Sequence, residues 1–202
     1  MSLLTIVFGT LVVLISTVLI RDVNDQKMNH TKGLNMQKNE SSGSISLAVF
    51  PGTFDPFTAG HLDLVERVRR FCSEMRIVVF DNDAKTPVMP KDARVALISR
   101  AVEHLDNVTV DRGEGLLADY CVRHGVDVIV RGVRNAFQFE EESVMAELNK
   151  RLGRGVETML VPASELRHVS STLVREIARY GGDLGELVPD AIRDDIEKAY
   201  SV

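Results

Sequence analysis

The sequence predicts an α/β protein in which helices flank an open, parallel β-sheet, and two observations carry this prediction. From Ser46 onward, short runs rich in Val, Ile and Leu alternate with amphipathic stretches, the pattern of strand and helix units wound around a parallel sheet. The short runs also lack the polar alternation of a half-exposed sheet, so both faces should be covered. The expected architecture is Rossmann-like: a doubly wound, five-stranded parallel sheet with flanking helices and a C-terminal helical extension.

The expected elements follow in chain order. The strands are short and apolar, and cover residues 46–50, 75–80, 108–111, 127–130 and 158–161. Between them, the stretches 60–71, 91–105, 114–124 and 136–152 carry apolar residues at spacings of three and four, as core-facing helices do. Two more helices are expected, one at 169–180 that stops at a Gly-Gly pair and one at 184–200 with Pro189 near its start.

Composition favours one compact domain, residues 46–202. The chain of 202 residues is 45% hydrophobic and 26% charged, and its formal net charge of -5 is spread along the sequence. No broad basic face is evident, so no nucleic acid partner is expected and any affinity for phosphate must be local. Cys72 and Cys121 are far apart in predicted helices, which favours reduced, buried thiols over a disulfide or a metal site.

Residues 1–20 form an apolar leader and residues 21–45 resemble a flexible linker. The uncharged run 3–20 is close to the minimum length for one membrane span. A secretory signal would need a basic residue before this run and a small-residue cleavage site after it, and both are missing. A membrane anchor with basic residues downstream would keep the domain in the cytoplasm. A true start at Met28 or Met36, which we favour, also gives a cytoplasmic protein.

The first strand leads into an irregular turn with the sequence Pro-Gly-Thr-Phe-Asp-Pro, residues 51–56, and a helix starts near Gly60. Thr58 and His61 lie at that helix start, where free amides and the helix dipole favour an anion. Gly60 would let a phosphate approach the backbone. Taken alone, these residues are better explained by a helix cap and a solvated histidine.

The loops after the other strands should face the same crevice, because open parallel sheets bind ligands beyond the carboxyl ends of their strands. Lys85 follows the second strand, and is either solvated or able to reach a phosphate. The fourth strand runs into Arg-Gly-Val-Arg, residues 131–134, where Arg131 must face a ligand or a carboxylate. The acidic residues 140–142 suit a helix start without any function. The hydroxyl run 170–172 offers a second anion cradle, which Arg175 could reinforce.

These motifs resemble those of a known enzyme superfamily. The residues Thr-Ala-Gly-His at 58–61 match the Thr-x-Gly-His motif of nucleotidyltransferases, and Ser-Ser-Thr at 170–172 is similar to their second, Ser-rich motif. Together with Phe-Pro-Gly-Thr-Phe-Asp-Pro at 50–56, Arg-Gly-Val-Arg at 131–134 and Phe-Glu-Glu-Glu at 139–142, they resemble the bacterial phosphopantetheine adenylyltransferases over roughly residues 47–200. The occurrence of these motifs in register makes the resemblance specific.

The resemblance implies transfer of an adenylyl group from ATP to 4'-phosphopantetheine, giving dephospho-coenzyme A and pyrophosphate by direct in-line attack without a covalent intermediate. It implies catalytic roles for His61, as transition-state stabiliser, and Lys85. It implies contacts with phosphopantetheine for Thr53, Lys85, Leu117 and Arg131. The residues implied in ATP binding are Thr53, Phe54, His61, Gly132, Val133, Arg134, Glu142, Leu166, Arg167, His168, Val169, Ser170, Ser171 and Thr172.

The resemblance further implies a Mg²⁺ ion bound by the nucleotide rather than by a protein cage, and a homohexamer. Two positions depart from the family pattern: His168 replaces an aromatic residue and Thr172 replaces a serine. Because of His168, the family pattern does not predict how side chains pack against the adenine ring. The rival interpretations are a sister transferase that uses CTP or nicotinamide mononucleotide, against which Arg131 with Glu142 argues, and a membrane-tethered nucleotide sensor.

Overall fold

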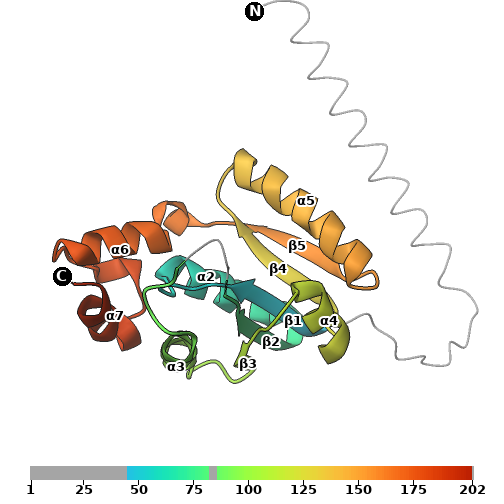
Figure 1. The fold of residues 1–202 in the computed structure, drawn as a ribbon, viewed down its shortest axis with the longest axis horizontal. Coiled ribbons are helices and arrows are strands. Elements are labelled where there is room, and N and C mark those ends of the chain that lie inside the picture. The colour runs from blue at the N-terminus through green and yellow to red at the C-terminus, as the bar shows by residue number, and fades with distance from the viewer. Residues whose placement is uncertain (1–44, 82–85, 202) are drawn as a thin grey trace, which may run out of the picture. The chain divides into compact units, whose positions relative to one another are not determined.

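The computed structural model describes residues 45–81 and 86–201, which form the predicted α/β fold (Figure 1). Within these residues a five-stranded sheet has the order β3-β2-β1-β4-β5, and every neighbouring pair is parallel. The strands are β1 (Ile45–Gly52), β2 (Cys72–Val79), β3 (Val108–Arg112), β4 (Val128–Val133) and β5 (Glu157–Pro162). The leader 1–20, the linker up to residue 44 and Lys85 lie outside the described residues.

Helices follow the strands in the alternation that the sequence predicts. They are α2 (Ala59–Val68), α3 (Lys91–Ala101), α4 (Leu117–His124), α5 (Ala136–Leu152), α6 (Ser171–Arg179) and α7 (Arg193–Tyr200). Short 3-10 turns occupy Arg69–Phe71, Glu165–His168, Gly185–Leu187 and Asp190–Ile192. No helix among residues 45–81 and 86–201 has the length and apolar character to cross a membrane.

The sheet buries both of its faces, as its continuous apolar strands require. Side chains of β1 alternate between two buried clusters. Ala48 and Phe50 belong to the larger cluster, which also contains residues of α2, α3, α6 and α7. Leu47 and Val49 face the opposite way and pack with Tyr120 of α4. Helix α5 contacts α4, β4 and β5, and Figure 1 shows it lying along the last two strands.

The strand order reverses at β1, which lies between β2 and β4. The connections that leave β1 and β4 therefore run to different sides and leave a crevice beyond the carboxyl ends of these strands, the usual ligand site of such sheets. The turn from β1 to α2 and the end of β4 border it. The fold therefore brings together the loops that the sequence predicts to share one site.

Several predicted boundaries were wrong. Strand β2 begins at Cys72 instead of residue 75, because Cys72 pairs with Ile45 at the start of β1, so Cys72 is not helical. Strand β4 continues to Val133, since its backbone pairs with β5 as far as Pro162, and Arg131 lies within the strand. Both cysteines are free; Cys121 is buried, whereas Cys72 is only half-buried.

The prediction of a single helix over residues 184–200 was also wrong. Two 3-10 turns precede α7, and Pro189, which lacks an amide hydrogen, caps the second turn. Helix α4 starts at Leu117 instead of residue 114, because the preceding residues include Gly115, whose φ of 70° is left-handed. Each difference arises where local backbone chemistry interrupts an apolar pattern that looks continuous.

Candidate active site

A cavity of about 1320 Å³ lies at the carboxyl ends of β1 and β4. It collects most of the residues predicted to bind ligand, while Val133, Arg167 and His168 are not part of its lining. The predicted residues that line it are Thr53, Phe54, His61, Leu117, Arg131, Gly132, Arg134, Glu142, Leu166, Val169, Ser170, Ser171 and Thr172. Its volume is ample for a nucleotide and a second small molecule.

The turn between β1 and α2 has a strained backbone. Phe54 has a φ of 50°, in the left-handed region that residues with a side chain rarely adopt. A left-handed residue of this kind costs about 1–3 kcal/mol and persists only where its surroundings hold it. The Phe54 ring is buried against Phe50 and Phe57, with ring centroids 5.2 and 5.6 Å away. Packing therefore fixes the side chain of this residue.

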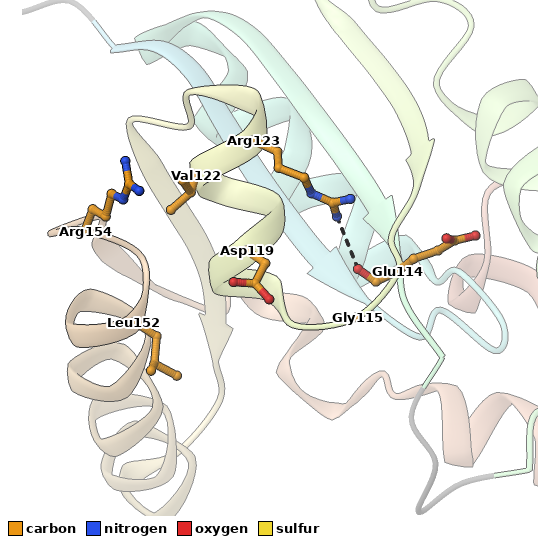
Figure 2. A pocket seen from close by; sticks show the side chains of 7 residues that line it. All are labelled: Glu114, Gly115, Asp119, Val122, Arg123, Leu152 and Arg154. Carbon is orange, nitrogen blue, oxygen red and sulfur yellow. Dashed lines mark hydrogen bonds between the residues drawn. The ribbon is translucent and has the colours of Figure 1, made fainter.

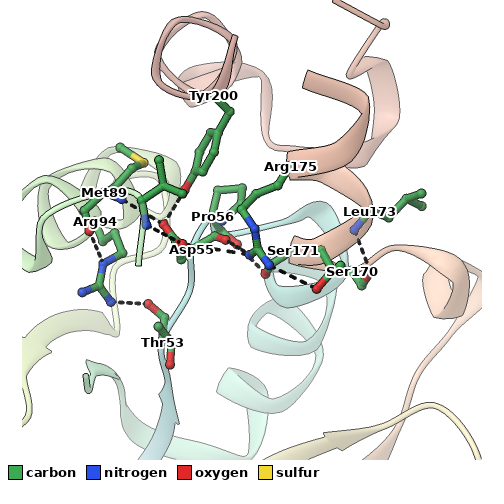
Figure 3. A network of polar contacts seen from close by, with 12 residues as sticks. Thr53, Asp55, Pro56, Met89, Arg94, Ser170, Ser171, Leu173, Arg175 and Tyr200 are labelled. Atoms are coloured by element: carbon green, nitrogen blue, oxygen red, sulfur yellow. Dashed lines mark hydrogen bonds and ion pairs between the residues drawn. The ribbon is translucent and has the colours of Figure 1, made fainter. Parts of the chain in front are cut away.

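Hydrogen bonds from distant elements hold the carbonyl groups of the same turn (Figure 3). Arg94 Nη1 of α3 donates to the Thr53 carbonyl at 2.5 Å, and Arg175 Nη1 of α6 donates to the Asp55 carbonyl. Ser171 Oγ donates to the Pro56 carbonyl at 2.8 Å. These carbonyl oxygens would repel a phosphate, and the donors occupy them. Within residues 45–81 and 86–201, the Thr53 and Phe54 amides have no hydrogen-bond acceptor, so in this part of the chain no protein group competes with an anion for them.

The carboxylate of Asp55 anchors the outer side of the turn. It is buried, and it accepts hydrogen bonds from the amides of Val88 at 2.9 Å and Met89 at 3.2 Å. It also accepts one from the Tyr200 hydroxyl of α7 at 2.5 Å (Figure 3). Burial, and then the Asp55 carboxylate, raise the pKa of the Tyr200 phenol, so the phenol stays protonated and donates.

His61 lies in the first turn of α2 and has a defined orientation. Its Nδ1 accepts a hydrogen bond from the Thr58 amide at 2.9 Å, and the Thr58 side chain accepts one from the His61 amide, which completes a capping box. Because Nδ1 is the acceptor, the neutral ring carries its hydrogen on Nε2. The alternative that Thr58 is a helix cap is thus correct, but His61 is not simply solvated, because the cap itself orients the ring.

The electrostatic surroundings keep His61 neutral. Burial, followed by the positive charges of Arg134 and Arg131, lowers the pKa of His61 from 6.5 to about 4. The rings of Phe54 and Phe57 lie 5.1 and 5.4 Å from the imidazole, centroid to centroid, which accounts for the burial. His61 is therefore a neutral hydrogen-bond donor at physiological pH and not a cation.

Arg131 faces a carboxylate, one of the two alternatives that its place at the strand end left open. Its Nε and Nη2 donate to the two carboxylate oxygens of Glu142 at 2.7 and 2.6 Å, and its Nη1 donates to the Pro51 carbonyl at 2.7 Å. This fork of two parallel bonds fixes the guanidinium plane beside the cavity. Arg134 bonds to Gln138 Oε1 and to the Val169 carbonyl, and so joins β4 to the start of α6.

Each hydroxyl group at the start of α6 has a partner within the protein. Ser170 caps the helix by accepting from the Leu173 amide at 3.1 Å, Ser171 donates to Pro56, and Thr172 accepts from Arg175 at 3.2 Å. The first backbone amides of the helix are what this segment offers to an anion. Arg175 donates to the turn and also lines the cavity.

Comparisons with known proteins agree with this geometry. A family model described as cytidylyltransferase-like matches residues 49–177. A phosphopantetheine adenylyltransferase of Bifidobacterium longum (strain DJO10A) is 44% identical over 151 residues, which cover 73% of this chain and 90% of the relative. Relatives of the same name from Picosynechococcus sp. (strain ATCC 27264 / PCC 7002 / PR-6) and Synechococcus sp. (strain JA-3-3Ab) are 40% and 43% identical, over 77% and 76% of this chain and 88% and 98% of their own lengths.

The chain belongs to the phosphopantetheine adenylyltransferase family. Membership confirms the resemblance stated from the motifs. In this member of the family, Gly60 has no packing reason to be glycine, since an added Cβ would come no closer than 3.6 Å to another atom. Gly60 lines the cavity, so the missing side chain leaves open space beside the backbone at this point.

An apolar wall of the cavity was not predicted from the sequence. It consists of Leu116 and the predicted Leu117 together with Met145, Leu148 and Leu152 of α5. The expectation that α5 faces a core was wrong, because none of its residues is buried. The spacing of its apolar residues correctly indicated an apolar face. Part of this face borders the cavity instead of packing against other side chains.

A second cavity, of about 650 Å³, lies between α4 and the end of α5 (Figure 2). Its lining mixes both signs of charge, from Glu114, Asp119, Arg123 and Arg154. Arg123 only approaches the Glu114 carbonyl, at 3.4 Å. No motif residue reaches this cavity, so the larger one is the candidate active site.

Proposed function

We propose that this chain transfers the adenylyl group of ATP to 4'-phosphopantetheine, giving dephospho-coenzyme A and pyrophosphate in coenzyme A synthesis. The observation that carries the proposal is that one cavity combines two kinds of wall. One wall offers amides and a neutral histidine to phosphates, and the other offers apolar side chains to an uncharged arm. The names of the relatives support this pairing of substrates.

The reaction needs no nucleophile from the protein. A phosphate oxygen of phosphopantetheine attacks the α-phosphorus of ATP, the bond from that phosphorus to the bridging oxygen of the β-phosphate breaks, and pyrophosphate leaves with the electron pair. The protein aligns two anions and stabilises the charge that develops on the equatorial oxygens. His61 Nε2 donates a hydrogen bond to one of these oxygens, and the amides of Thr53 and Phe54 donate to neighbouring ones. Lys85, which lies outside the described residues, is proposed from the resemblance to contact the phosphates of the reacting pair.

The two substrates occupy different ends of the cavity. Phosphopantetheine lies between Arg131, which binds its phosphate, and the apolar wall around Leu117, which contacts its arm. ATP lies toward Arg134 and the start of α6. The residues proposed to bind it are Thr53, Phe54, His61, Gly132, Val133, Arg134, Glu142, Leu166, Arg167, His168, Val169, Ser170, Ser171 and Thr172.

A Mg²⁺ ion bound with the nucleotide would supply charge neutralisation at its phosphates. No cluster of three His, Cys, Asp or Glu side chains able to hold a metal occurs in residues 45–81 and 86–201. These residues do not fit a protein cage, and the ligands of the ion would be phosphate oxygens and water. We also propose a homohexamer in the cytoplasm, with membrane attachment only if residues 3–20 form an anchor.

The direct test supplies purified protein with ATP and 4'-phosphopantetheine and measures pyrophosphate release together with dephospho-coenzyme A by mass spectrometry. We expect both products in equal amounts. Parallel reactions with CTP and glycerol phosphate, and with ATP and nicotinamide mononucleotide, test the sister transferases. Product from either pair alone would refute the proposed substrates, and ATP binding without turnover of any pair would indicate a sensor.

A further inference from the structure

Arg94 has the largest fully buried side chain among the described residues, with 2% of its surface exposed. It does not belong to any of the predicted motifs. It lies on α3, whose other basic residues are solvent-accessible at their ends, such as Arg100. A buried arginine is rare unless its donors are satisfied. Its surroundings satisfy them on three sides.

The Arg94 guanidinium joins three separate segments at the rim of the cavity. Nη1 donates to the Thr53 carbonyl at 2.5 Å, Nε donates to the Met89 carbonyl at 3.0 Å, and Nη2 pairs with Asp81 at 2.6 Å. Thr53 follows β1 and Asp81 follows β2, so one side chain ties the ends of two neighbouring strands together. Lys91, one turn earlier on α3, pairs with the other oxygen of Asp81 at 2.9 Å.

Arg94 does not itself line the cavity, although Thr53 and Asp81 do. The peptide group that it holds, between Thr53 and Phe54, immediately precedes the left-handed Phe54. In a trans peptide the C=O and N–H groups point in opposite directions. Because Arg94 binds the Thr53 carbonyl, the Phe54 N–H of the same peptide points away from Arg94. Arg175 holds the Asp55 carbonyl on the other side of Phe54.

We propose that Arg94 is a positioning residue for adenylyl transfer: by holding the Thr53 carbonyl behind the cavity wall, it keeps the Phe54 amide aimed at the reacting phosphates. The role rests on the proposed function, because it acts on the amides that stabilise the transition state. It requires a planar fork with several donors in fixed directions. A lysine has the same charge but cannot reach three acceptors that lie in different directions.

The test compares wild type with Arg94→Lys and with a matched control, Arg100→Lys, on the exposed side of the same helix. Each protein is assayed for dephospho-coenzyme A formation at a temperature where circular dichroism shows it fully folded. We expect kcat of Arg94→Lys to fall about 100-fold, the scale of an ångström-level misplacement of reacting groups, with a much smaller change in KM for ATP. Arg100→Lys should remain within about twofold of wild type, the range expected for an exposed ion pair.

A folded Arg94→Lys with the kcat of wild type would overturn the proposal, since a purely structural arginine affects stability and not turnover of the folded protein. An inactive wild type would instead refute the proposed function, so the two failures are distinguishable. Asp81→Asn gives a second measurement that does not depend on folding of the Arg94 variant. It weakens the ion pair but leaves both carbonyl contacts, so kcat should fall less than about tenfold. A loss as large as 100-fold would assign the effect to the ion pair and also overturn the proposal.

Discussion

The two walls of the candidate active site are built in opposite ways. The turn at residues 51–58 is strained at Phe54, and hydrogen bonds from α3, α6 and β4 hold its carbonyl groups. Helix α5, on the other side, has no buried residue and presents Met145 and Leu148 to the cavity at about half exposure. The wall that meets the reacting phosphates is thus rigid before any ligand binds, as transition-state stabilisation requires. The wall proposed for the pantetheine arm contributes binding and needs less definition.

The rigid wall should therefore control kcat, and its loss should give the largest effect. His61→Ala removes the neutral Nε2 donor, and kcat should fall by roughly two to three orders of magnitude, the scale for loss of one oxyanion donor. His61→Gln, which retains an N–H donor, should lose less. His104, exposed and paired with Glu66, supplies the control His104→Ala. Steady-state kinetics with unchanged turnover in His61→Ala would remove His61 from the mechanism.

Substitution of Arg131, which makes paired hydrogen bonds to Glu142, should have the next largest effect on the kinetics. Arg131→Lys keeps the charge but loses the paired bonds to Glu142, so the ammonium is no longer fixed beside the substrate phosphate. We expect kcat/KM for phosphopantetheine to fall about tenfold to 100-fold. Arg151→Lys, which changes an exposed pair with Glu147 on α5, is the matched control. Equal kinetics of the two variants would contradict a role for the fork.

The hydrogen bond between Tyr200 and Asp55, which anchors the turn, should contribute to the free energy of unfolding. Tyr200→Phe removes the hydroxyl that donates to the buried Asp55 carboxylate, which should lower the free energy of unfolding by about 1–3 kcal/mol. Denaturant titration measures this change. Tyr180 is 82% exposed, so Tyr180→Phe should unfold at the midpoint of wild type. No difference between the two variants would show that the carboxylate finds another partner.

Substitutions in the apolar wall on α5 should change KM and not kcat, and the change should be smaller than for the residues above. Met145 is 47% exposed, so Met145→Ala should cost little stability, while KM for phosphopantetheine rises about fivefold through the loss of roughly 1 kcal/mol of apolar contact. Val144, 68% exposed and outside the cavity lining, provides the control Val144→Ala. A fall in kcat without a change in KM would mean that α5 also positions the reacting groups.

The pH dependence should show no effect of His61 near neutrality. With its pKa at about 4, His61 stays neutral from pH 6 to 9, and kcat should have no inflection that His61→Gln abolishes. The unfolded chain, with a normal pKa of 6.5, binds more protons than the folded one between pH 4 and 6.5. The free energy of unfolding should therefore fall as pH is lowered through that window, and less so in His61→Gln. An acid limb of kcat near pH 6.5 that disappears in this variant would refute a neutral donor.

Much of the site could be predicted because parallel strands end at one edge of a sheet. Short apolar runs located β1 and β4, and the unusual residues after them had to meet. Arg131 at a strand end required a carboxylate or a ligand, and Glu142 supplies the carboxylate. These inferences use residues that are unusual for their local position, and such residues stand out in a sequence.

The remaining features depend on contacts that leave no local pattern. Arg94 has the sequence context of a surface residue in a helix, and its burial follows from the packing of α3 against the loop ends. An amphipathic stretch does not reveal whether its apolar face meets side chains or an open cavity, so the exposure of α5 was missed. Strand ends were misjudged for the same reason, since pairing with a neighbouring strand extends them through charged and polar residues.

The hydrogen bond between Tyr200 and Asp55 spans 145 residues of sequence, and this separation affects how the site forms during protein synthesis. The phosphate-binding turn leaves the ribosome early, but the phenol that anchors its buried carboxylate is made roughly 7 to 30 s later at typical elongation rates. During that interval Asp55 has the amides of Val88 and Met89 as donors but not the Tyr200 hydroxyl, and the turn has one fewer constraint on its strained conformation. The phosphate site of a nascent chain should therefore gain its last anchor when α7 has been translated.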